Sequence, residues 1–470
     1  MAQMPRMLSI EIDRKSLLKR RSLMGKLIKK NSKMTDSIKS IQSVPALLSE
    51  KSVANKIENY VGTIPLPLGL CGPVGMDGEF AKGSFVVPMA TLEGTLLASY
   101  SRGCRIMDEC AKKLGHSGVE AWVFDDYFLR CTNFVTRNLK DSIQLMKWLQ
   151  ENKQKMIDCA NAGDRFLNVK EMSFEAVADV VTVSMKLETF DAMGSNMGSK
   201  AANDVYSVVM QDPFASKFVK DALIPYPEDK KYIPNRLKGK KVIVRTVLEK
   251  EVFERMTRTT LETYHEFVRN FRNMLAYHQS SAMNIHTNNG LAAMFLAFGQ
   301  DAAYLGESAS NIVEAKFVDR EHTQLAVTLT LPGLIIGSVG GGTGLPAYQS
   351  NLAVVGCDGY GNSKKLAEIM GAIALAGEVS CGAAQCSGEF VVAHETMCKN
   401  DPLKEETKET QKREIDDSDD GNESPPEDGS NESSYDTHGR LKDGIEVGCH
   451  APLTTYNCCS KKEEPFTYRW

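Results

Sequence analysis

The alternation of apolar and polar positions predicts strands at four places along the chain. Residues 122–134 alternate as a half-buried strand does. The valine-rich run 177–187 is typical of a buried strand. Two further runs with strand character cover residues 241–247 and 326–331.

Helices are predicted around these strands. The segment 366–385 is rich in Ala and Gly, which suits a helix whose backbone packs close to a neighbour. The other predicted helices cover residues 90–114, 140–156, 251–277 and 286–305. A Pro- and Gly-rich segment, residues 65–75, is expected to form turns ahead of the first of them.

The chain of 470 residues is too long for one simple core, so two or three domains are expected. The elements between residues 122 and 220 predict a compact α+β unit inserted into a larger domain. That larger domain would comprise residues 57–121 and 221–400. The predicted fold class is therefore α+β.

The two ends of the chain differ from this middle part. Residues 1–56 are predicted to be an N-terminal helical segment, because the first 40 carry eleven Lys and Arg with apolar residues near helical spacing. A helix packed on its own protein is favoured over an organelle presequence or a membrane-surface helix. Residues 401–470 are predicted to be a disordered acidic tail, since Glu414 to Glu432 holds nine acids and no Lys or Arg.

Composition narrows the possible function. A net charge of −4 gives no case for nucleic acid as a partner. Twelve cysteines lack the regular spacing of a metal or disulfide framework, so no metal site is expected and reduced thiols in the cytoplasm are favoured. No run approaches the ~18 apolar residues of a transmembrane helix, and no signal peptide is visible.

Two glycine-containing stretches carry the strongest chemical signal. Asp191-Ala-Met-Gly-Ser-Asn-Met197 and Gly337-Ser-Val-Gly-Gly-Gly-Thr343 place small or flexible residues where backbone can approach a ligand closely. Neither contains the GxGxxG fingerprint of a Rossmann fold. Taken alone, the second stretch would be interpreted as a flexible turn.

Four other short motifs are individually weak but occur in a distinctive order. Glu93 lies in Pro88-Met-Ala-Thr-Leu-Glu-Gly, and Lys230 lies in Asp229-Lys-Lys. Asp301 lies in Gly-Gln-Asp-Ala-Ala, and His394 follows an Ala- and Gly-rich helix. With the two glycine stretches, this order resembles the hydroxymethylglutaryl-CoA reductase family, closer to its eukaryotic class but without that class's membrane region. The resemblance runs from about residue 14 to 400.

This resemblance implies a large helix-rich substrate domain and an inserted, small ferredoxin-like domain, residues 122–220, that binds NADP(H). It also implies a homodimer or homotetramer with the site at the dimer interface, and Glu58-Asn-Tyr-Val-Gly62 resembles the family's interface motif. The reaction would be the four-electron reduction of hydroxymethylglutaryl-CoA to mevalonate and CoA with two NADPH, which feeds isoprenoid and sterol synthesis.

The resemblance also implies roles for individual residues. The catalytic residues would be Glu93, Lys230, Asp301 and His394. Binding of the acyl-CoA would involve Ser99, Arg102, Asp229, Lys231, Arg269 and Asn289. Binding of the dinucleotide would involve Arg165, Phe166, Asp191, Met193, Gly194, Asn196, Met197, Gly340, Gly341, Gly342 and Thr343.

Three positions depart from the family pattern. Asp164 replaces a serine before the Arg-Phe pair, and an acid there favours a ribose 2′-hydroxyl over a 2′-phosphate, so NADH is a possible cofactor. Glu120 aligns with an arginine expected near the hydroxymethylglutaryl group, and Leu223 aligns with a serine. These two leave open a reductase of a different acyl-CoA. A catalytically inactive binding homologue is the third alternative.

Overall fold

The structure is a computed structural model that describes residues 57, 60, 62–223, 228–234 and 236–391. The predicted N-terminal segment 1–56, the acidic tail 401–470 and His394 lie outside the described residues. Within the described part, mixed helices and strands confirm the coarse prediction of a chain that contains both.

One long strand, β3 (Val119–Thr136), belongs to two sheets. Its first half pairs with β1 (Leu68–Gly78) in parallel and with β7 (Gly239–Glu249) in antiparallel orientation. From Phe128 onward it pairs instead with β5 and β6. The change of partner therefore falls after Tyr127, six residues beyond the boundary that the sequence suggests, because the strand continues unbroken from one sheet into the other.

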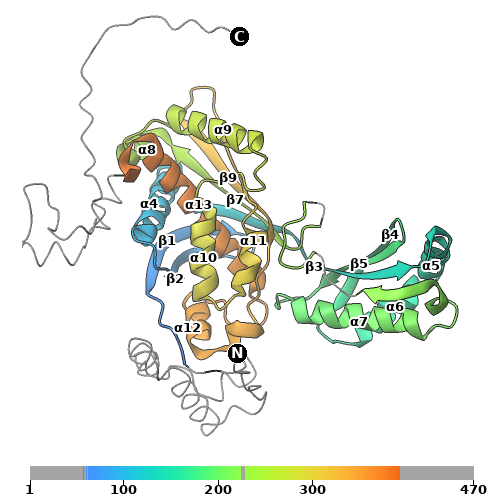
Figure 1. Cartoon of the computed structure of the whole chain (residues 1–470). Coiled ribbons are helices and arrows are strands. Elements are labelled where there is room, and N and C mark those ends of the chain that lie inside the picture. Colours follow the sequence, from blue (N-terminus) through green and yellow to red (C-terminus); the bar gives the residue numbers. More distant parts are fainter. Residues whose placement is uncertain (1–56, 58–59, 61, 224–227, 235, 392–470) are drawn as a thin grey trace, which may run out of the picture. The chain divides into compact units, whose positions relative to one another are not determined.

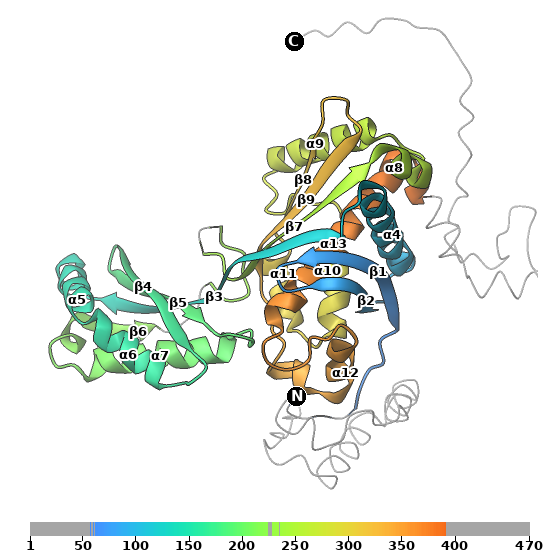
Figure 2. The same ribbon diagram turned by 180° about the vertical axis from the view of Figure 1, so that it is seen from behind.

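The larger sheet has the strand order β2-β1-β3-β7-β9-β8. All its neighbours are antiparallel except β1 and β3. Figure 2 shows these strands in front of the helices that cover their other face. The remaining strands are β2 (Lys82–Ala90), β8 (Ile312–Phe317) and β9 (Gln324–Leu334). The sequence missed β1 because the Pro and Gly residues of 65–75 suggested only turns, and it assigned no element to most of β2.

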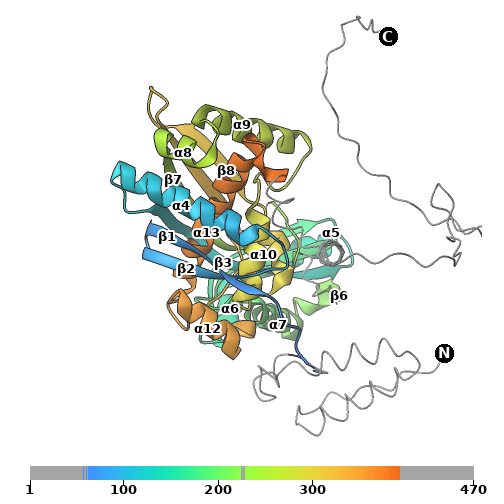
Figure 3. The same cartoon turned by 90° about the vertical axis from the view of Figure 1, so that its left-hand side faces the viewer.

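Two helices pack across this sheet, α4 (Leu96–Leu114) and α13 (Ser363–Cys386) (Figures 1 and 3). They approach so closely that a Cβ on Gly103 of α4 would lie 1.9 Å from the carbonyl oxygen of Ala376 in α13. Helix α13 is the only helix within the described residues long and apolar enough to cross a membrane, and it is wholly buried in the protein.

Tyr100 of α4 connects this core to α10 (Thr287–Ala297). Its ring fills the space left by Gly290 and Gly377, where a Cβ would lie within 2.6 Å of the ring. Its hydroxyl donates to the carbonyl of His286 at 2.5 Å and accepts from the amide of Gly290 at 2.8 Å. The start of α10, which carries Asn289, is thereby fixed against α4.

The smaller sheet pairs β6 with β3, β3 with β5 and β5 with β4. Three helices accompany it, and α7 begins at Ser195, within the first glycine stretch and directly after Gly194. The elements are α5 (Leu139–Glu151), α6 (Lys153–Ala162), β4 (Asn168–Val177), β5 (Val180–Glu188), α7 (Ser195–Gln211) and β6 (Val219–Leu223).

Three predicted helices are interrupted. The expected helix 140–156 divides at Asn152 into α5 and α6. The expected helix 251–277 divides into α8 (Lys250–Thr257) and α9 (Leu261–Tyr277), because Arg258 adopts φ 55° and the Thr260 side chain caps the second helix. The expected helix 286–305 ends at Ala297, since Gly299 turns the chain with φ 66°.

After that turn come the short helices η2 (Ala302–Tyr304) and α11 (Leu305–Ser308), which follow Asp301. The remaining short elements are η1 (Ser216–Phe218), η3 (Gly341–Gly344) and α12 (Pro346–Val354).

The contact between α4 and α13 yields a stability prediction. Gly103→Ala should lower the free energy of unfolding by about 3 kcal/mol, because the new methyl group meets backbone that cannot move aside. Gly306→Ala is the matched control, since nothing lies within 4 Å of its Cβ position and its φ is not positive. Urea denaturation followed by circular dichroism measures both. Equal unfolding free energies for the two variants would contradict the packing described.

Candidate active site

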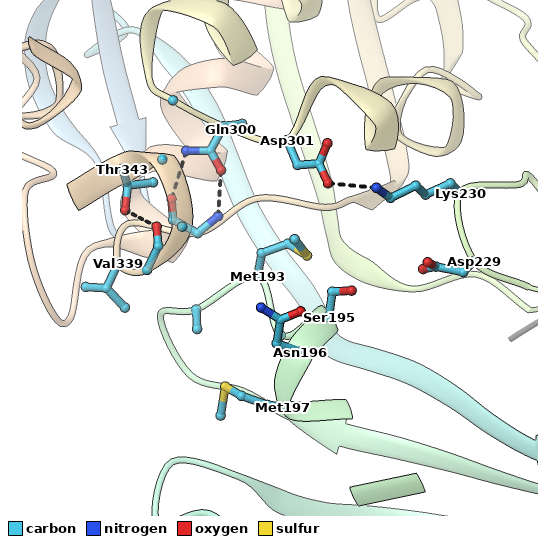
Figure 4. Close-up of a pocket in the computed structure, with 17 residues that line it drawn as sticks. Met193, Ser195, Asn196, Met197, Asp229, Lys230, Gln300, Asp301, Val339 and Thr343 are labelled. Atoms are coloured by element: carbon cyan, nitrogen blue, oxygen red, sulfur yellow. Dashed lines mark hydrogen bonds and ion pairs between the residues drawn. The ribbon is translucent and has the colours of Figure 1, made fainter. Parts of the chain in front are cut away.

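A cavity of about 580 Å³ opens where three distant segments of the chain meet (Figure 4). The first segment is the stretch before and into α7, the second surrounds Asp301, and the third contains the glycines after β9. Asp229 and Lys230 close the remaining side. The full lining is Ala192, Met193, Gly194, Ser195, Asn196, Met197, Asp229, Lys230, Gly299, Gln300, Asp301, Gly337, Val339, Gly340, Gly341, Gly342 and Thr343.

The two glycine stretches predicted from the sequence touch each other directly. The carbonyl of Asp191 accepts hydrogen bonds from the amides of Ser338 at 2.9 Å and Val339 at 3.3 Å. Ala192 and Val339 form a parallel bridge. A Cβ at Gly337 would lie 2.7 Å from the backbone nitrogen of Met193, so only glycine permits this approach.

Gln300 ties the third segment to the same point. Its side-chain amide donates to the carbonyl of Gly337 at 2.9 Å, and its side-chain oxygen accepts from the amide of Gly337 at 2.9 Å (Figure 4). This pair of bonds satisfies both backbone groups of Gly337. The residue next to Gln300 is Asp301, whose position is therefore set by the glycine stretch.

Gly340 and Gly341 present bare backbone at the cavity. They have φ of 84° and 54°, a region that disfavours residues with a side chain, and nothing lies within 4 Å of either Cβ position. A ligand can thus approach the main chain here without meeting a side chain. The Thr343 hydroxyl donates to the carbonyl of Gly340 at 2.5 Å, which holds the turn.

Lys230 points its ammonium group at Asp301, with 3.1 Å between Nζ and the carboxylate (Figure 4). Both side chains are about two-fifths exposed, at 44% and 40%. The Lys230 ammonium also lies 5.3 Å from the ring centre of Tyr304. Lys230 and Asp301 come from separate sequence motifs, and the structure places them together.

The loop that carries Lys230 is anchored by buried charges that the sequence reasoning missed. Arg130 of β3 is fully buried and lies 3.4 Å from the Asp229 carboxylate and 3.7 Å from that of Glu228. Lys238 donates to the carbonyl of Glu228 at 2.6 Å and pairs with Glu307 at 3.0 Å. Burial raises the pKa of Glu307 despite this lysine. A lone Arg within a strand, or a lone Lys just before one, gives no motif by which these anchors could be found.

Glu93 lies apart from this cavity. Its carboxylate accepts a hydrogen bond from the Asn289 side chain at 2.8 Å and faces His286 at 3.8 Å. It is not among the residues that line the cavity with Lys230. The described part of a single chain therefore brings Lys230 and Asp301 together but not Glu93.

A second cavity, also of about 580 Å³, lies beside α4. Its lining includes Arg102, one of the residues predicted to bind the acyl-CoA, together with Arg105 and Ser101. Arg102 donates to the hydroxyl and carbonyl of Ser380 at 3.0 and 2.7 Å, and the Ser99 hydroxyl lies 3.2 Å from the same hydroxyl. Ser99 and Arg102 thus share one partner on α13.

Arg165 and Phe166 lie outside both cavities but form a stacked group. The Arg165 guanidinium lies 4.5 Å from the Phe166 ring centre, and Tyr360 stacks on the ring with centres 5.8 Å apart. Tyr360 comes from the large domain, and the sequence did not single it out. The Asp164 carboxylate accepts from the amide of Phe166 at 2.9 Å, so it holds this turn.

Several predicted residues have other surroundings. The Asp191 carboxylate accepts from the amides of Gly361 at 2.7 Å and Ser363 at 3.0 Å rather than lining the cavity. Glu120 pairs with Arg245 at 3.1 Å and also lies outside the cavity lining. Arg269 is exposed on α9, and the exposed Lys231 reaches only the carbonyl of Asp229, at 3.4 Å. Leu223 pairs through its backbone with Asn133.

Two glycine stretches that meet beside a lysine–carboxylate pair form a site of the kind that an oxidoreductase needs. The family model for hydroxymethylglutaryl-coenzyme A reductase matches residues 16–399. The chain belongs to this family.

Individual relatives agree with the family. The 3-hydroxy-3-methylglutaryl-coenzyme A reductase of Methanocaldococcus jannaschii is 33% identical over 362 residues, which cover 74% of this chain and 86% of that protein. The enzyme of Pyrococcus abyssi is 32% identical over 359 residues, which cover 73% and 85%. The fungal enzyme of Phycomyces blakesleeanus is 30% identical over 354 residues, which cover 72% of this chain and 29% of that longer protein.

Solved structures share the fold. The 3-hydroxy-3-methylglutaryl-coenzyme A reductase of Streptococcus pneumoniae aligns with a TM-score of 0.58 at 18% identity, over 78% of this chain and 96% of that one. A second structure, of the class II enzyme from that organism bound to NADPH, aligns with a TM-score of 0.56 at 18% identity, over the same shares of the two chains.

The environment of Asp191 yields a pH prediction. Burial acts to raise its pKa, but hydrogen bonds from Gly361 and Ser363 outweigh burial and lower it. A lowered carboxylate pKa contributes stability above the unfolded value of about 3.9, and that stability is lost as pH falls through the folded value. Asp191→Asn should therefore cost about 1–2 kcal/mol of unfolding free energy at pH 7.

The deficit of this variant should begin to shrink below about pH 4, where Asp191 of the unfolded chain takes up a proton, and should shrink further as pH falls through the lowered pKa of the folded state. Urea denaturation at pH 7 and pH 3.5 measures it. The exposed Asp158→Asn serves as the control and should match the wild type at both pH values. A deficit for Asp191→Asn that is the same at both pH values would exclude the proposed charge effect.

Proposed function

We propose that the protein reduces hydroxymethylglutaryl-CoA to mevalonate and CoA with two NADPH. The observation that carries this proposal is the ion pair of Lys230 and Asp301 at the wall of the glycine-lined cavity. A thioester carbonyl that accepts a hydride develops negative charge on its oxygen, and a lysine held beside the reacting carbon stabilises that charge in the transition state. Asp301 orients the ammonium group and balances its charge.

The cavity also suits a dinucleotide. NADPH, when bound, supplies the hydride. Gly340 and Gly341 offer open backbone, and Met193, Asn196 and Met197 face the cavity from the other side. The inserted residues 122–220, with β6 extending to Leu223, would form the dinucleotide-binding domain. Its predicted ferredoxin-like character belongs to this proposal.

The NADPH selection would lie at Arg165. Its guanidinium packs against the Phe166 ring. In that arrangement the N–H groups at the edge of the guanidinium would donate hydrogen bonds to a 2′-phosphate. Asp164 already accepts the Phe166 amide, so part of its acceptor capacity is used in the turn. This use weakens the argument for NADH that Asp164 raises from sequence alone.

A second copy of the chain would complete the site. Within one chain Glu93 contacts Asn289 and His286 rather than Lys230. The family forms its site across a dimer interface, so we assign Glu93 as the proton donor to the aldehyde oxygen in a homodimer or homotetramer. His394, outside the described residues, would protonate the departing CoA thiolate, because the pKa of histidine suits proton transfer near neutral pH.

The acyl-CoA would lie along α4. Ser101, Arg102 and Arg105 offer a hydroxyl and two cations at the second cavity, which suits the phosphates of CoA, and Ser99 lies beside them against Ser380. Glu120 gives no support to a different acyl group, because Arg245 pairs with it and it does not line the cavity with Lys230. We therefore retain hydroxymethylglutaryl-CoA as the substrate.

Replacing the lysine tests the proposed chemistry. Lys230→Met should lower kcat by about 10²- to 10³-fold, because the cation that stabilises the oxyanion is lost. Oxidation of NADPH in the presence of hydroxymethylglutaryl-CoA, followed at 340 nm, measures it. Lys82→Met, a surface lysine paired with Asp77, is the matched control and should retain wild-type kcat. A wild-type protein that binds CoA esters but never oxidises NADPH would instead identify an inactive binding homologue.

The cofactor preference has its own test. The wild type should show a higher kcat/KM with NADPH than with NADH, and Asp164→Ser should increase that ratio by about three- to tenfold by removing negative charge near the 2′-phosphate. The exposed Asp158→Ser controls for net charge and should leave the ratio unchanged. A wild type that prefers NADH would refute the role assigned to Arg165.

A further inference from the structure

Tyr304 stands between the two loops that the reaction uses. Its side chain is fully buried. Its hydroxyl lies 2.9 Å from the Ser195 hydroxyl, at the start of α7, and 2.8 Å from the Asp229 carboxylate, next to Lys230. One hydroxyl group therefore joins the first glycine stretch, Asp191–Met197, which is proposed to bind the nicotinamide, to the loop that carries Asp229 and Lys230.

The number of available protons fixes which group donates in each of these hydrogen bonds. A carboxylate only accepts, so the single proton of Tyr304 is donated to Asp229. The Ser195 hydroxyl must then donate its proton to Tyr304, and it accepts from the guanidinium of Arg130 at 3.2 Å. Arg130 lies 3.4 Å from Asp229 as well, which closes a ring of four side chains.

The ring needs a neutral tyrosine. Burial raises the pKa of Tyr304 well above its ordinary value, and the neighbouring Asp229 carboxylate raises it further. Tyr304 thus keeps its proton throughout the pH range in which enzymes work. Its aromatic ring lies under the Lys230 ammonium at 5.3 Å and meets Phe128 edge-on, with centres 6.4 Å apart.

We propose that Tyr304 is a positioning residue that couples the seating of the nicotinamide to the placement of Lys230. A shift of α7 at Ser195 changes the hydrogen bond between Ser195 and Tyr304. This change in turn alters the hydrogen bond by which Tyr304 holds the Asp229 carboxylate. The lysine then reaches its working position when the cofactor loop is in place. This inference rests on the proposed function for the part that concerns turnover, but the link between the loops is independent of it.

Three variants test the link. Tyr304→Phe removes only the tyrosine hydroxyl and keeps the ring beneath Lys230. Ser195→Ala removes the serine hydroxyl that bonds to it, and the third variant combines both substitutions. Tyr264→Phe is the control, because Tyr264 is also fully buried and its hydroxyl makes a hydrogen bond, to the carbonyl of Glu378 at 3.3 Å, that does not involve either loop. Calorimetric titration with NADP⁺ and steady-state kinetics with hydroxymethylglutaryl-CoA are measured for all of them.

Tyr304→Phe should lower kcat about tenfold and raise the dissociation constant of NADP⁺ about threefold, with the KM for hydroxymethylglutaryl-CoA changed less than twofold. The double variant should be much less impaired than the product of the two single effects, because either change breaks the same chain. Tyr264→Phe should leave all three constants within twofold of the wild type.

Multiplicative effects of the two substitutions, or a Tyr304→Phe protein that behaves like Tyr264→Phe, would overturn the coupling. A wild type inactive toward hydroxymethylglutaryl-CoA would refute the proposed function alone, since the NADP⁺ titrations would still decide the coupling. Equal NADP⁺ binding by the wild type and the three variants, or none by any of them, would count against Tyr304 even then.

Discussion

The contact between the backbone at Asp191–Met193 and the backbone at Gly337–Val339 determines the geometry of the whole site. Gly337 allows this contact because it has no side chain to separate the two backbone segments. The Gln300 side chain hydrogen-bonds both the amide and the carbonyl of Gly337. The Asp191 carboxylate extends the contact to the start of α13. Three segments that are distant in sequence are thereby fixed together, and Asp301 follows Gln300 into place. A ligand meets a preformed wall, which lowers the entropy lost on binding.

Buried ion pairs fix the opposite wall of the cavity, which Asp229 and Lys230 form. Arg130 and Lys238 are buried beneath the loop of Lys230 and are matched there by Glu228, Asp229 and Glu307. Burying so many charges is costly unless each has a close partner, so the arrangement tolerates little rearrangement. Lys230 itself remains more exposed than these buried supports, which suits the role proposed for it in contacting a substrate. The same loop is therefore fixed by buried ion pairs and presents the Lys230 side chain to the cavity.

The sequence could predict those features that depend on local composition. The strands β3, β5, β7 and β9, the helix α13 and the glycine stretches follow from periodicity and from residues with special backbone freedom. The divisions at Asn152 and Arg258 were missed because each depends on one turn within an otherwise helical pattern. Arg130 and Tyr304 were missed because their importance comes from partners elsewhere in the chain. Glu93 illustrates the opposite limit, since the order of the motifs points to it, but the described part of one chain does not bring it to Lys230.

The unbroken course of β3 bears on modularity. An inserted domain joined by two loops can be removed, exchanged or grafted by cutting those loops. Here one of the two junctions is the middle of a strand that pairs with β1 and β7 before Phe128 and with β5 and β6 after it. A cut at this junction would leave two fraying strand ends, one in each sheet. One strand therefore joins the two sheets, and any exchange of the residues beyond Tyr127 must preserve the register on both sides of it.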